Sequence, residues 1–264
     1  MDTRPIGIID SGSGGLSIWN AISTLLPHES ILYVGDHAHA PYGGKTRTFI
    51  RTRVKKCLAY LIEKKQCKLI VVACNTSTVA GIDWYRTQFP MIPIVGVVPA
   101  IKTAARMTKT KNICILSTKF TAKSSYIQQL IRDFAPDATV FSLGSSKLAS
   151  FIESTKNETE HIKRELSHMC NSVMNTPVDV VVLGCTHYPF IQDEMRTFFG
   201  DAVSVIDSAD AVARQVARIL EHNHIAAHAN PTYTFFTTGN SNMVSLVMSR
   251  LTGRTIVVEP LLIP

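Results

Sequence analysis

The sequence predicts an α/β fold built from two related lobes with mainly parallel sheets. Short β-rich segments alternate with helical patterns along the 264 residues, which is typical of parallel strands joined by crossover helices. An apolar strand that ends in a small residue, a cysteine and a threonine occurs twice, at residues 71–76 and 182–186. The chain is long enough to give two such lobes their own cores.

The elements can be followed in order from the apolar patterns. Strands are predicted at residues 6–9, 31–35, 69–73, 94–97, 113–116, 178–183 and 203–206. After the first strand, apolar residues three and four apart predict a helix from Leu16 to Leu26, which Pro27 ends. The same spacing predicts helices over residues 50–61 and 212–220.

The composition is that of a globular protein, with 45% hydrophobic and 18% charged residues. The first residues show no export signal. Every apolar run is shorter than the roughly 18 residues that a membrane-spanning helix needs. We therefore expect a cytoplasmic protein with no membrane partner, whose six cysteines remain thiols in a reducing compartment.

Basic residues outnumber acidic ones by 27 to 20, and the excess is concentrated at residues 45–56 and 102–111. A nucleic-acid partner has to be considered for this reason. The first stretch also carries apolar residues at helical spacing, so its charges are interpreted as the solvent face of an amphipathic helix. We therefore do not expect nucleic-acid binding, although a positive field could attract a small anionic substrate.

Polar residues precede each of the two cysteines at a similar distance. Asp10-Ser11 follows the strand 6–9, and Ser117-Thr118 follows the strand 113–116. Ligands of parallel α/β sheets collect at the carboxyl ends of strands, where loops and helix N-termini meet. The duplication therefore predicts that these segments and both cysteines contribute to one site.

The glycine-rich run from Asp10 to Gly15 opens a helix and allows two interpretations. It resembles a dinucleotide loop in its Gly12-x-Gly14 spacing, and Asp36 lies where a ribose-binding acid would. However, Ser17 replaces the third glycine, and Asp10 would repel a pyrophosphate. The alternative is that the glycines let backbone amides approach a carboxylate while Asp10 acts on a cationic or polar group.

The turn-rich loop at residues 36–45 also has two interpretations. It could be a tight connection, or it could close over a substrate with the backbone of Gly43 and the phenol of Tyr42. His37 and His39 stand two residues apart, but no other ligand cluster lies nearby in sequence, so we expect no metal there.

Cys74 and Cys185 differ from the other four cysteines by their position after an apolar strand. Asn75-Thr76-Ser77-Thr78 follows Cys74 where a helix should begin, and Thr186-His187 follows Cys185. A helix N-terminus favours a thiolate, so we expect the pKa of Cys74 to lie below the usual value of about 8.5. The other cysteines are read as core residues or left unassigned.

Three functions compete for these thiols: a single Cys–His nucleophile, a Cys/His metal site and a two-thiol acid/base pair. A single nucleophile leaves the other motif unexplained, and Cys185 with His187 supplies only two metal ligands. Two matching thiols could exchange the α-proton of an amino acid on opposite faces. Asn75, Thr76, Thr186 and loop amides would then stabilise the carbanion-like state.

Together these motifs resemble those of the glutamate racemases of the aspartate/glutamate racemase superfamily, over nearly the whole chain. The matching segments are Asp10-Ser11-Gly12 through Gly15, Ala40-Pro41-Tyr42-Gly43, Ala73-Cys74-Asn75-Thr76 and Leu183-Gly184-Cys185-Thr186-His187-Tyr188-Pro189. The resemblance implies two pseudosymmetric α/β lobes with the active site in the cleft between them. We expect one domain from residues 1–97 with 208–264, and a second from residues 98–207.

The resemblance also implies interconversion of L- and D-glutamate without a cofactor or metal, which would supply D-glutamate for peptidoglycan. Cys74 and Cys185 would be the acid/base pair, assisted by Asp10 and His187, with Glu153 as a further acid. The implied substrate-binding residues are Asp10, Ser11, Pro41, Tyr42, Gly43, Asn75, Thr76, Thr121, Thr186 and His187. A homodimer is expected on the same basis.

The sequence departs from the family pattern in a few places. His37 and His39 stand where threonine and arginine are usual, and Ser146-Lys147 replaces a common Cys-Pro pair. Only nine residues precede Asp10, so no activator-binding extension is expected at the N-terminus. His187 resembles the glutamate-acting branch, and a related racemase of aspartate or a basic regulatory protein remains the alternative.

Overall fold

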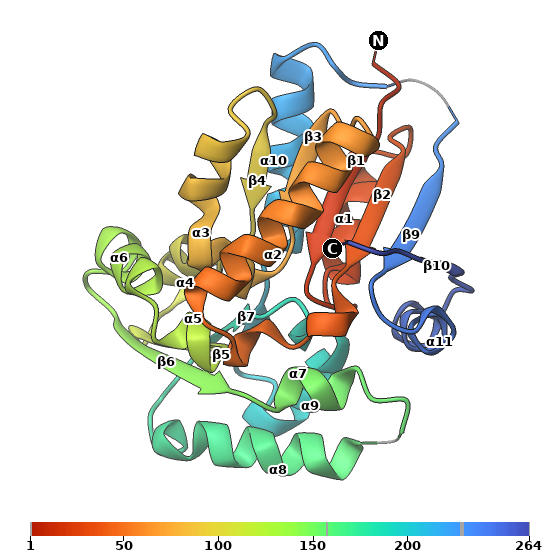
Figure 1. Cartoon of the computed structure of the whole chain (residues 1–264). Coiled ribbons are helices and arrows are strands. Elements are labelled where there is room, and N and C mark those ends of the chain that lie inside the picture. The colour runs from red at the N-terminus through yellow and green to blue at the C-terminus, as the bar shows by residue number, and fades with distance from the viewer. Residues whose placement is uncertain (1, 157, 228–229, 264) are drawn as a thin grey trace. The chain divides into compact units, whose positions relative to one another are not determined.

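The structure is a computed structural model that describes residues 2–156, 158–227 and 230–263. It divides into two compact units (Figure 1), the first formed by Met1–Val97 with Ala209–Pro264 and the second by Val98–Ser208. Each unit contains one sheet whose strands are all paired in parallel. The predicted α/β class with parallel sheets in two sets is confirmed.

The first unit has a six-stranded sheet of order β10-β9-β2-β1-β3-β4. Its strands are β1 (Ile6–Asp10), β2 (Ile31–Gly35), β3 (Leu69–Val72), β4 (Ile94–Gly96), β9 (Tyr233–Thr237) and β10 (Val258–Pro260). Its helices are α1 (Leu16–Leu25), α2 (Arg47–Ala59), α3 (Asn75–Gln88), α10 (Ala209–His222) and α11 (Ser241–Thr252). A π-helical turn, Tyr60–Lys64, extends α2.

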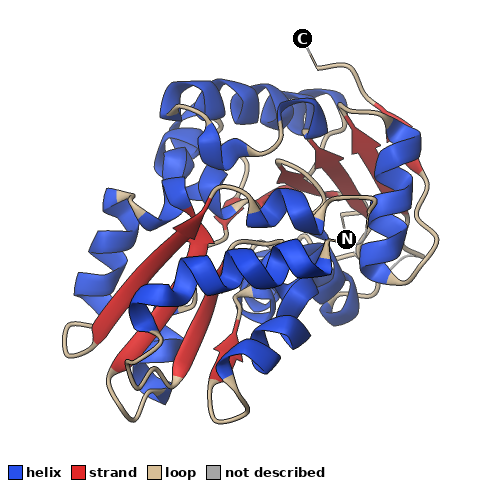
Figure 2. Ribbon diagram, turned by 90° about the horizontal axis from the view of Figure 1, so that it is seen from below, coloured by secondary structure: helices blue, strands red, loops and turns tan. Residues whose placement is uncertain are grey.

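The second unit has a four-stranded sheet of order β6-β5-β7-β8. Its strands are β5 (Asn112–Thr118), β6 (Thr139–Ser145), β7 (Val180–Gly184) and β8 (Ser204–Ile206). Its helices are α4 (Ile101–Met107), α5 (Lys119–Ala122), α6 (Ser125–Phe134), α7 (Leu148–Ile152), α8 (Thr159–Cys170) and α9 (Gln192–Phe199). Helices flank the strands (Figure 2), which explains why β3 and β7 are continuous apolar runs that are buried throughout.

The duplication seen in the sequence has a counterpart in topology. The strand order β2-β1-β3-β4 in the first unit matches β6-β5-β7-β8 in the second. Ile9 pairs with Val72 in one sheet, and Leu116 pairs with Leu183 in the other. Cys74 and Cys185 each lie two residues beyond the paired residue of β3 or β7, so the two thiols occupy matching positions in their sheets.

Three strands were not predicted: β6, β9 and β10. β6 and β10 lie at sheet edges, where fewer side chains are buried, and β9 lies next to β10. Strands with one exposed side carry a weaker apolar signal.

Within the described part of the chain, no helix has the length and apolar character needed to span a membrane.

Candidate active site

Cys74 lies between β3 and α3 in the first unit. It is the N-cap residue of α3, and its sulfur accepts a hydrogen bond from the backbone amide of Ser77 at 3.5 Å. The Cys74 thiol also donates to Ser11 Oγ at 3.6 Å. Only 6% of Cys74 is exposed, so the thiol is held in place by neighbours from two adjacent strand ends.

Asp10 ends β1 beside this thiol and is fully buried. One of its oxygens, Oδ1, accepts from the amide of Gly12 at 2.8 Å and from Ser11 Oγ at 3.5 Å. The start of α1 lies close to the Asp10 side chain, because a Cβ on Gly15 would stand 2.9 Å from Asp10 Cβ. The glycine-rich run thus brings its backbone close to the Asp10 side chain.

The prediction of a lowered pKa for Cys74 was wrong. Burial, and after it the negative charge of Asp10, raise the pKa of Cys74 to about 11. The hydrogen bonds from Ser77 and Ser11 oppose this shift but are the smaller effects. Desolvation of a thiolate in a closed site therefore outweighs the helix N-terminus.

Cys185 follows β7 in the second unit, where it meets an imidazole and a carboxylate. Its sulfur lies 3.7 Å from His187 Nδ1, and His187 Nε2 lies 2.8 Å from Glu153 Oε1. Glu153 is the C-cap residue of α7, so this helix delivers the carboxylate to the end of β7. Cys185 and His187 are both almost completely buried.

The pKa of His187 is raised well above its usual value. Burial by itself would lower the pKa, but the Glu153 carboxylate and the hydrogen bond to Cys185 outweigh burial. A protonated imidazole next to the thiol can stabilise the negative charge of a thiolate. The structure therefore brings Cys185, His187 and Glu153 into one hydrogen-bonded row.

The two thiols have chemically different neighbours despite their matching positions. Ser117 occupies the place in β5 that Asp10 occupies in β1, and its hydroxyl donates to the backbone oxygen of Thr118 at 3.2 Å. Cys185 instead lies next to the imidazole of His187. One thiol thus has a carboxylate beside it and the other an imidazole.

The remaining predicted residues are mostly buried at these strand ends. Asn75 donates from Nδ2 to the backbone oxygen of Val97 at 3.3 Å. Thr76 and Thr186, which follow Cys74 by two residues and Cys185 by one, are also buried. Thr121 is fully buried in α5, and its hydroxyl accepts from Thr118 at 3.1 Å. Thr121 therefore lies beyond β5, the strand next to β7.

The loop after β2 contains two short 3-10 turns, His37–His39 and Tyr42–Gly44. Pro41 is exposed and Gly43 is half-buried. The phenol of Tyr42, which we expected to be available to a ligand, instead donates to Asp36 Oδ2 at 2.6 Å. His39 also contacts Asp36, at 3.0 Å, so a side chain of the same loop holds its ring.

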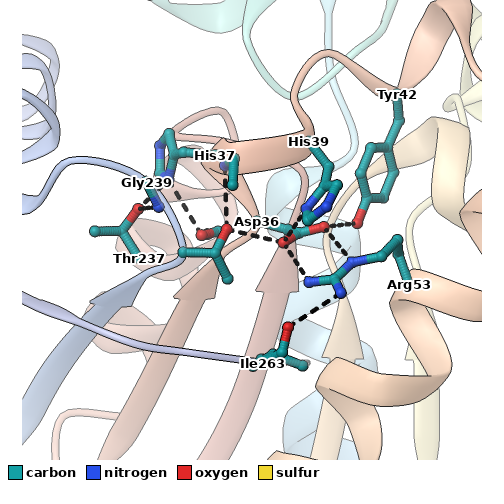
Figure 3. A network of polar contacts seen from close by, with 11 residues as sticks. Asp36, His37, His39, Tyr42, Arg53, Thr237, Gly239 and Ile263 are labelled. Carbon is teal, nitrogen blue, oxygen red and sulfur yellow. Dashed lines mark hydrogen bonds and ion pairs between the residues drawn. The ribbon is translucent and has the colours of Figure 1, made fainter.

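Asp36 is the centre of a polar network rather than a ribose-binding acid (Figure 3). Its buried carboxylate accepts from Arg53 at 3.0 and 3.2 Å and from Thr238 Oγ1 at 2.8 Å. Burial alone would raise the pKa of Asp36, but the bonds from Arg53, Tyr42, Thr238 and His39 lower it.

The sequence interpretation missed Arg53 as the partner of Asp36. Arg53 is buried, so it does not belong to the solvent face of its helix. The helical spacing could have revealed that Arg53 is buried. Arg53 lies three residues after Ile50 and four before Cys57, which are both in the core, so it shares their face of the helix. Among the residues that the structure describes, no group of three or more His, Cys, Asp or Glu side chains is arranged to hold a metal ion.

Comparison with known proteins gives consistent results. The model of the Asp/Glu/Hydantoin racemase family matches residues 6–216. A glutamate racemase of Stutzerimonas stutzeri is 36% identical over 255 residues, which cover 97% of this chain and 96% of the relative.

Solved structures agree with the sequence matches. A glutamate racemase isoform from Bacillus anthracis has a TM-score of 0.90 at 30% identity, covering 100% of this chain and 99% of that one. The Escherichia coli glutamate racemase, solved with L-glutamate and an activator, has a TM-score of 0.86 at 33% identity, with 99% of both chains covered. The resemblance to glutamate racemases is thus confirmed, and the chain belongs to the Asp/Glu/Hydantoin racemase family and is an isomerase of the racemase type.

Proposed function

We propose that this protein is a glutamate racemase that interconverts L- and D-glutamate by exchanging the α-proton between Cys74 and Cys185, without a cofactor. The observation that carries the proposal is the matching position of the two thiols, each just beyond the strand that pairs with the first strand of its sheet. The names of the relatives support glutamate as the substrate.

Inversion of the α-carbon requires one group to remove a proton and another to deliver one. In one direction, a thiolate takes the α-proton from one face, and the opposite thiol gives its own proton to the other face. The sulfur that began as a thiolate ends as a thiol, and the other ends as a thiolate. In the reverse direction the roles exchange, so one turnover consumes no net proton.

The raised pKa of Cys74 has a consequence for this scheme. In the free enzyme Cys74 holds its proton at neutral pH, since burial and Asp10 disfavour the thiolate. A substrate ammonium group next to Asp10 would offset the carboxylate charge and favour the thiolate. Substrate binding would then activate Cys74, while His187, held by Glu153, serves Cys185.

The other residues are proposed to bind glutamate and stabilise its carbanion-like state. Hydrogen-bond donors that are fixed in a buried site stabilise developing charge better than water does. The proposed substrate contacts are Asp10, Ser11, Pro41, Tyr42, Gly43, Asn75, Thr76, Thr121, Thr186 and His187.

We also propose that the enzyme works in the cytoplasm as a homodimer and supplies D-glutamate for peptidoglycan. All six cysteines are buried free thiols, which suits a reducing compartment. Growth of a D-glutamate-requiring bacterial strain on expression of this chain tests the peptidoglycan role. Sedimentation analysis tests the dimer.

The decisive experiment follows racemisation in D2O, in metal-free buffer without pyridoxal phosphate. The wild-type protein should abolish the optical rotation of L-glutamate and introduce deuterium at the α-carbon. Cys74→Ala and Cys185→Ala should each lower the rate by at least about 1,000-fold. As matched controls, Cys57→Ala and Cys170→Ala remove buried thiols elsewhere in the same two units and should remain active.

The serine variants test the division of labour between the thiols. Because the two enantiomers are equally stable, kcat/KM must stay equal in both directions in every variant. Cys74→Ser and Cys185→Ser should nevertheless change kcat unequally in the two directions, with opposite bias. Full activity of either alanine variant contradicts the two-thiol mechanism, and turnover of aspartate but not glutamate contradicts the substrate.

A further inference from the structure

The imidazole of His37 joins two parts of the first unit that are far apart in sequence. Its Nε2 lies 2.9 Å from Ser13 Oγ, in the glycine-rich run. Its Nδ1 lies 2.9 Å from Thr237 Oγ1, at the end of β9, and 3.2 Å from the backbone oxygen of Gly35. Figure 3 shows His37 between Thr237 and Gly239 on one side and the loop at Asp36 on the other.

The surrounding backbone leaves room for this ring. A Cβ on Gly35 would stand 2.6 Å from His37 Nδ1, and a Cβ on Gly239 would stand 2.9 Å from His37 Cβ. Contacts this short are not tolerated by real side chains, so two glycines from separate segments are needed for the imidazole to pack here. The position of His37 is therefore set by shape as well as by hydrogen bonds.

The partners also define the state of the ring. The oxygen of Gly35 can only accept, so Nδ1 carries the hydrogen. In the neutral ring Nε2 is then an acceptor, and the Ser13 hydroxyl donates to it. Thr237 Oγ1 accepts from Nδ1 and from the amide of Gly239, at 2.9 Å in both cases.

On the Ser13 side, the hydrogen bonds of His37 continue towards Asp10. The neighbouring residue, Gly12, donates its amide to Asp10 Oδ1 at 2.8 Å. The backbone oxygen of Gly12 accepts from Tyr33 at 2.7 Å. A shift of Ser13 would therefore move the amide that orients the Asp10 carboxylate.

The Thr237 end lies outside the residues that match the family model, which end at 216. This turn is itself anchored, since Thr238 donates its amide to the Gly35 oxygen at 3.1 Å and Leu261 donates to the Thr237 oxygen at 2.7 Å. A segment beyond the family match is thus connected through His37 by hydrogen bonds to the run that carries Asp10.

We propose that His37 is a positioning residue, which fixes the Asp10–Ser13 run against the Thr237–Gly239 turn and so sets the orientation of Asp10 beside Cys74. The inference rests on the proposed function, because it assigns His37 to the racemisation site without contact to substrate. Misplacement of a catalytic group by a fraction of an ångström lowers turnover more than binding.

The test is a double-mutant cycle on racemisation kinetics with Ser13→Ala, His37→Ala and the double variant. Each single change should lower kcat about tenfold while KM changes less than about twofold. The double variant should be no slower than the slower single variant, because both changes break one connection. His37→Gln, whose amide reaches Ser13, should recover kcat to within about threefold of wild type.

Circular dichroism and melting curves accompany each variant. His161→Ala, which alters an exposed histidine in the second unit, is the control that should keep wild-type kinetics. If His37→Ala does not fold, Ser13→Ala and His37→Gln still decide the question. Wild-type kcat in Ser13→Ala, or purely additive effects, overturns the positioning role. Absence of racemisation by the wild-type protein instead overturns the proposed function.

Discussion

The two thiols differ mainly in the charge of the group that lies beside each of them. Cys74 has the Asp10 carboxylate nearby, which opposes its ionisation. Cys185 lies next to His187, whose raised pKa favours a cationic ring. Groups of opposite charge beside two otherwise equivalent thiols give each thiol a different cost of ionisation.

Glu153→Gln should lower the pKa of His187, because the carboxylate is the largest factor that raises it against burial. A histidine with a raised folded-state pKa stabilises the protein below its unfolded pKa, and this contribution is lost as pH rises through the folded pKa. The variant should therefore lose more stability at pH 6 than at pH 9. NMR titration of His187 measures the midpoint directly.

Glu160→Gln is the matched control, because Glu160 lies on an exposed face of the same unit. It should leave the His187 midpoint where it is in the wild type. An unchanged midpoint in Glu153→Gln would show that the 2.8 Å contact does not govern the charge of the ring.

The positions of both cysteines at strand ends could be predicted from the sequence, since strand periodicity and the repeated motif are local signals. The pKa of Cys74 could not, because it depends on burial and on Asp10, which a distant segment supplies. Tyr42 and Asp36 gave a similar result. Their types and spacing suggested ligand binding, but the hydrogen bond between them forms only in the folded chain.

Among the helices and strands of the second unit, one carboxylate holds together the starts of two neighbouring strands, β5 and β7. Asp179, directly before β7, accepts from Thr108 Oγ1 and the amide of Lys109, both at 2.6 Å, and from the amide of Thr110 at 3.0 Å. These bonds tie the turn between α4 and β5 to the start of β7. Burial would raise the pKa of Asp179, but the bonds lower it to about 2.

Asp179→Asn should lower the free energy of unfolding at pH 7 by about 1–2 kcal/mol, after allowance for partial solvent exposure. A depressed folded-state pKa stabilises the protein above the unfolded value, and this contribution is lost as pH falls towards 2. The difference from wild type should therefore be smaller at pH 3 than at pH 7. Urea unfolding at both values measures it, with exposed Asp193→Asn as the control.

Prediction from sequence was most successful for the inner strands. β1, β3, β5 and β7 are buried along their length or nearly so, and buried parallel strands have long apolar runs. The strands β6, β9 and β10 were missed because their pattern mixes exposed and buried positions. β10 even contains Pro260, which is tolerated only where the ladder is incomplete.

At the scale of the whole molecule, the Asp36–Arg53 pair connects segments from opposite ends of the sequence. Besides Asp36, Arg53 donates to the backbone oxygen of Ile263 at 3.2 Å. Thr238 joins the same carboxylate from the β9–α11 turn. This single network fixes the loop after β2, α2 and the segment after β10 within the first unit.

Arg53→Met should lower the free energy of unfolding by about 3 kcal/mol, because it leaves the buried Asp36 carboxylate without its cation. Arg86→Met breaks an exposed ion pair with Asp83 and should cost less than about 1 kcal/mol. Urea unfolding of both variants provides the comparison. Equal losses would mean that the buried network adds nothing beyond a surface pair.

The division of the chain into units also determines the order in which its parts can fold during synthesis. The second unit is one continuous segment, whereas β2 in the first unit pairs with β9, which is made roughly 200 residues later. At a translation rate of about 5–20 residues per second, one side of β2 waits without its partner for ~10–40 s. An unpaired strand edge is a template for wrong pairing, so the inserted second unit lengthens the time during which the nascent chain is open to mispairing at β2.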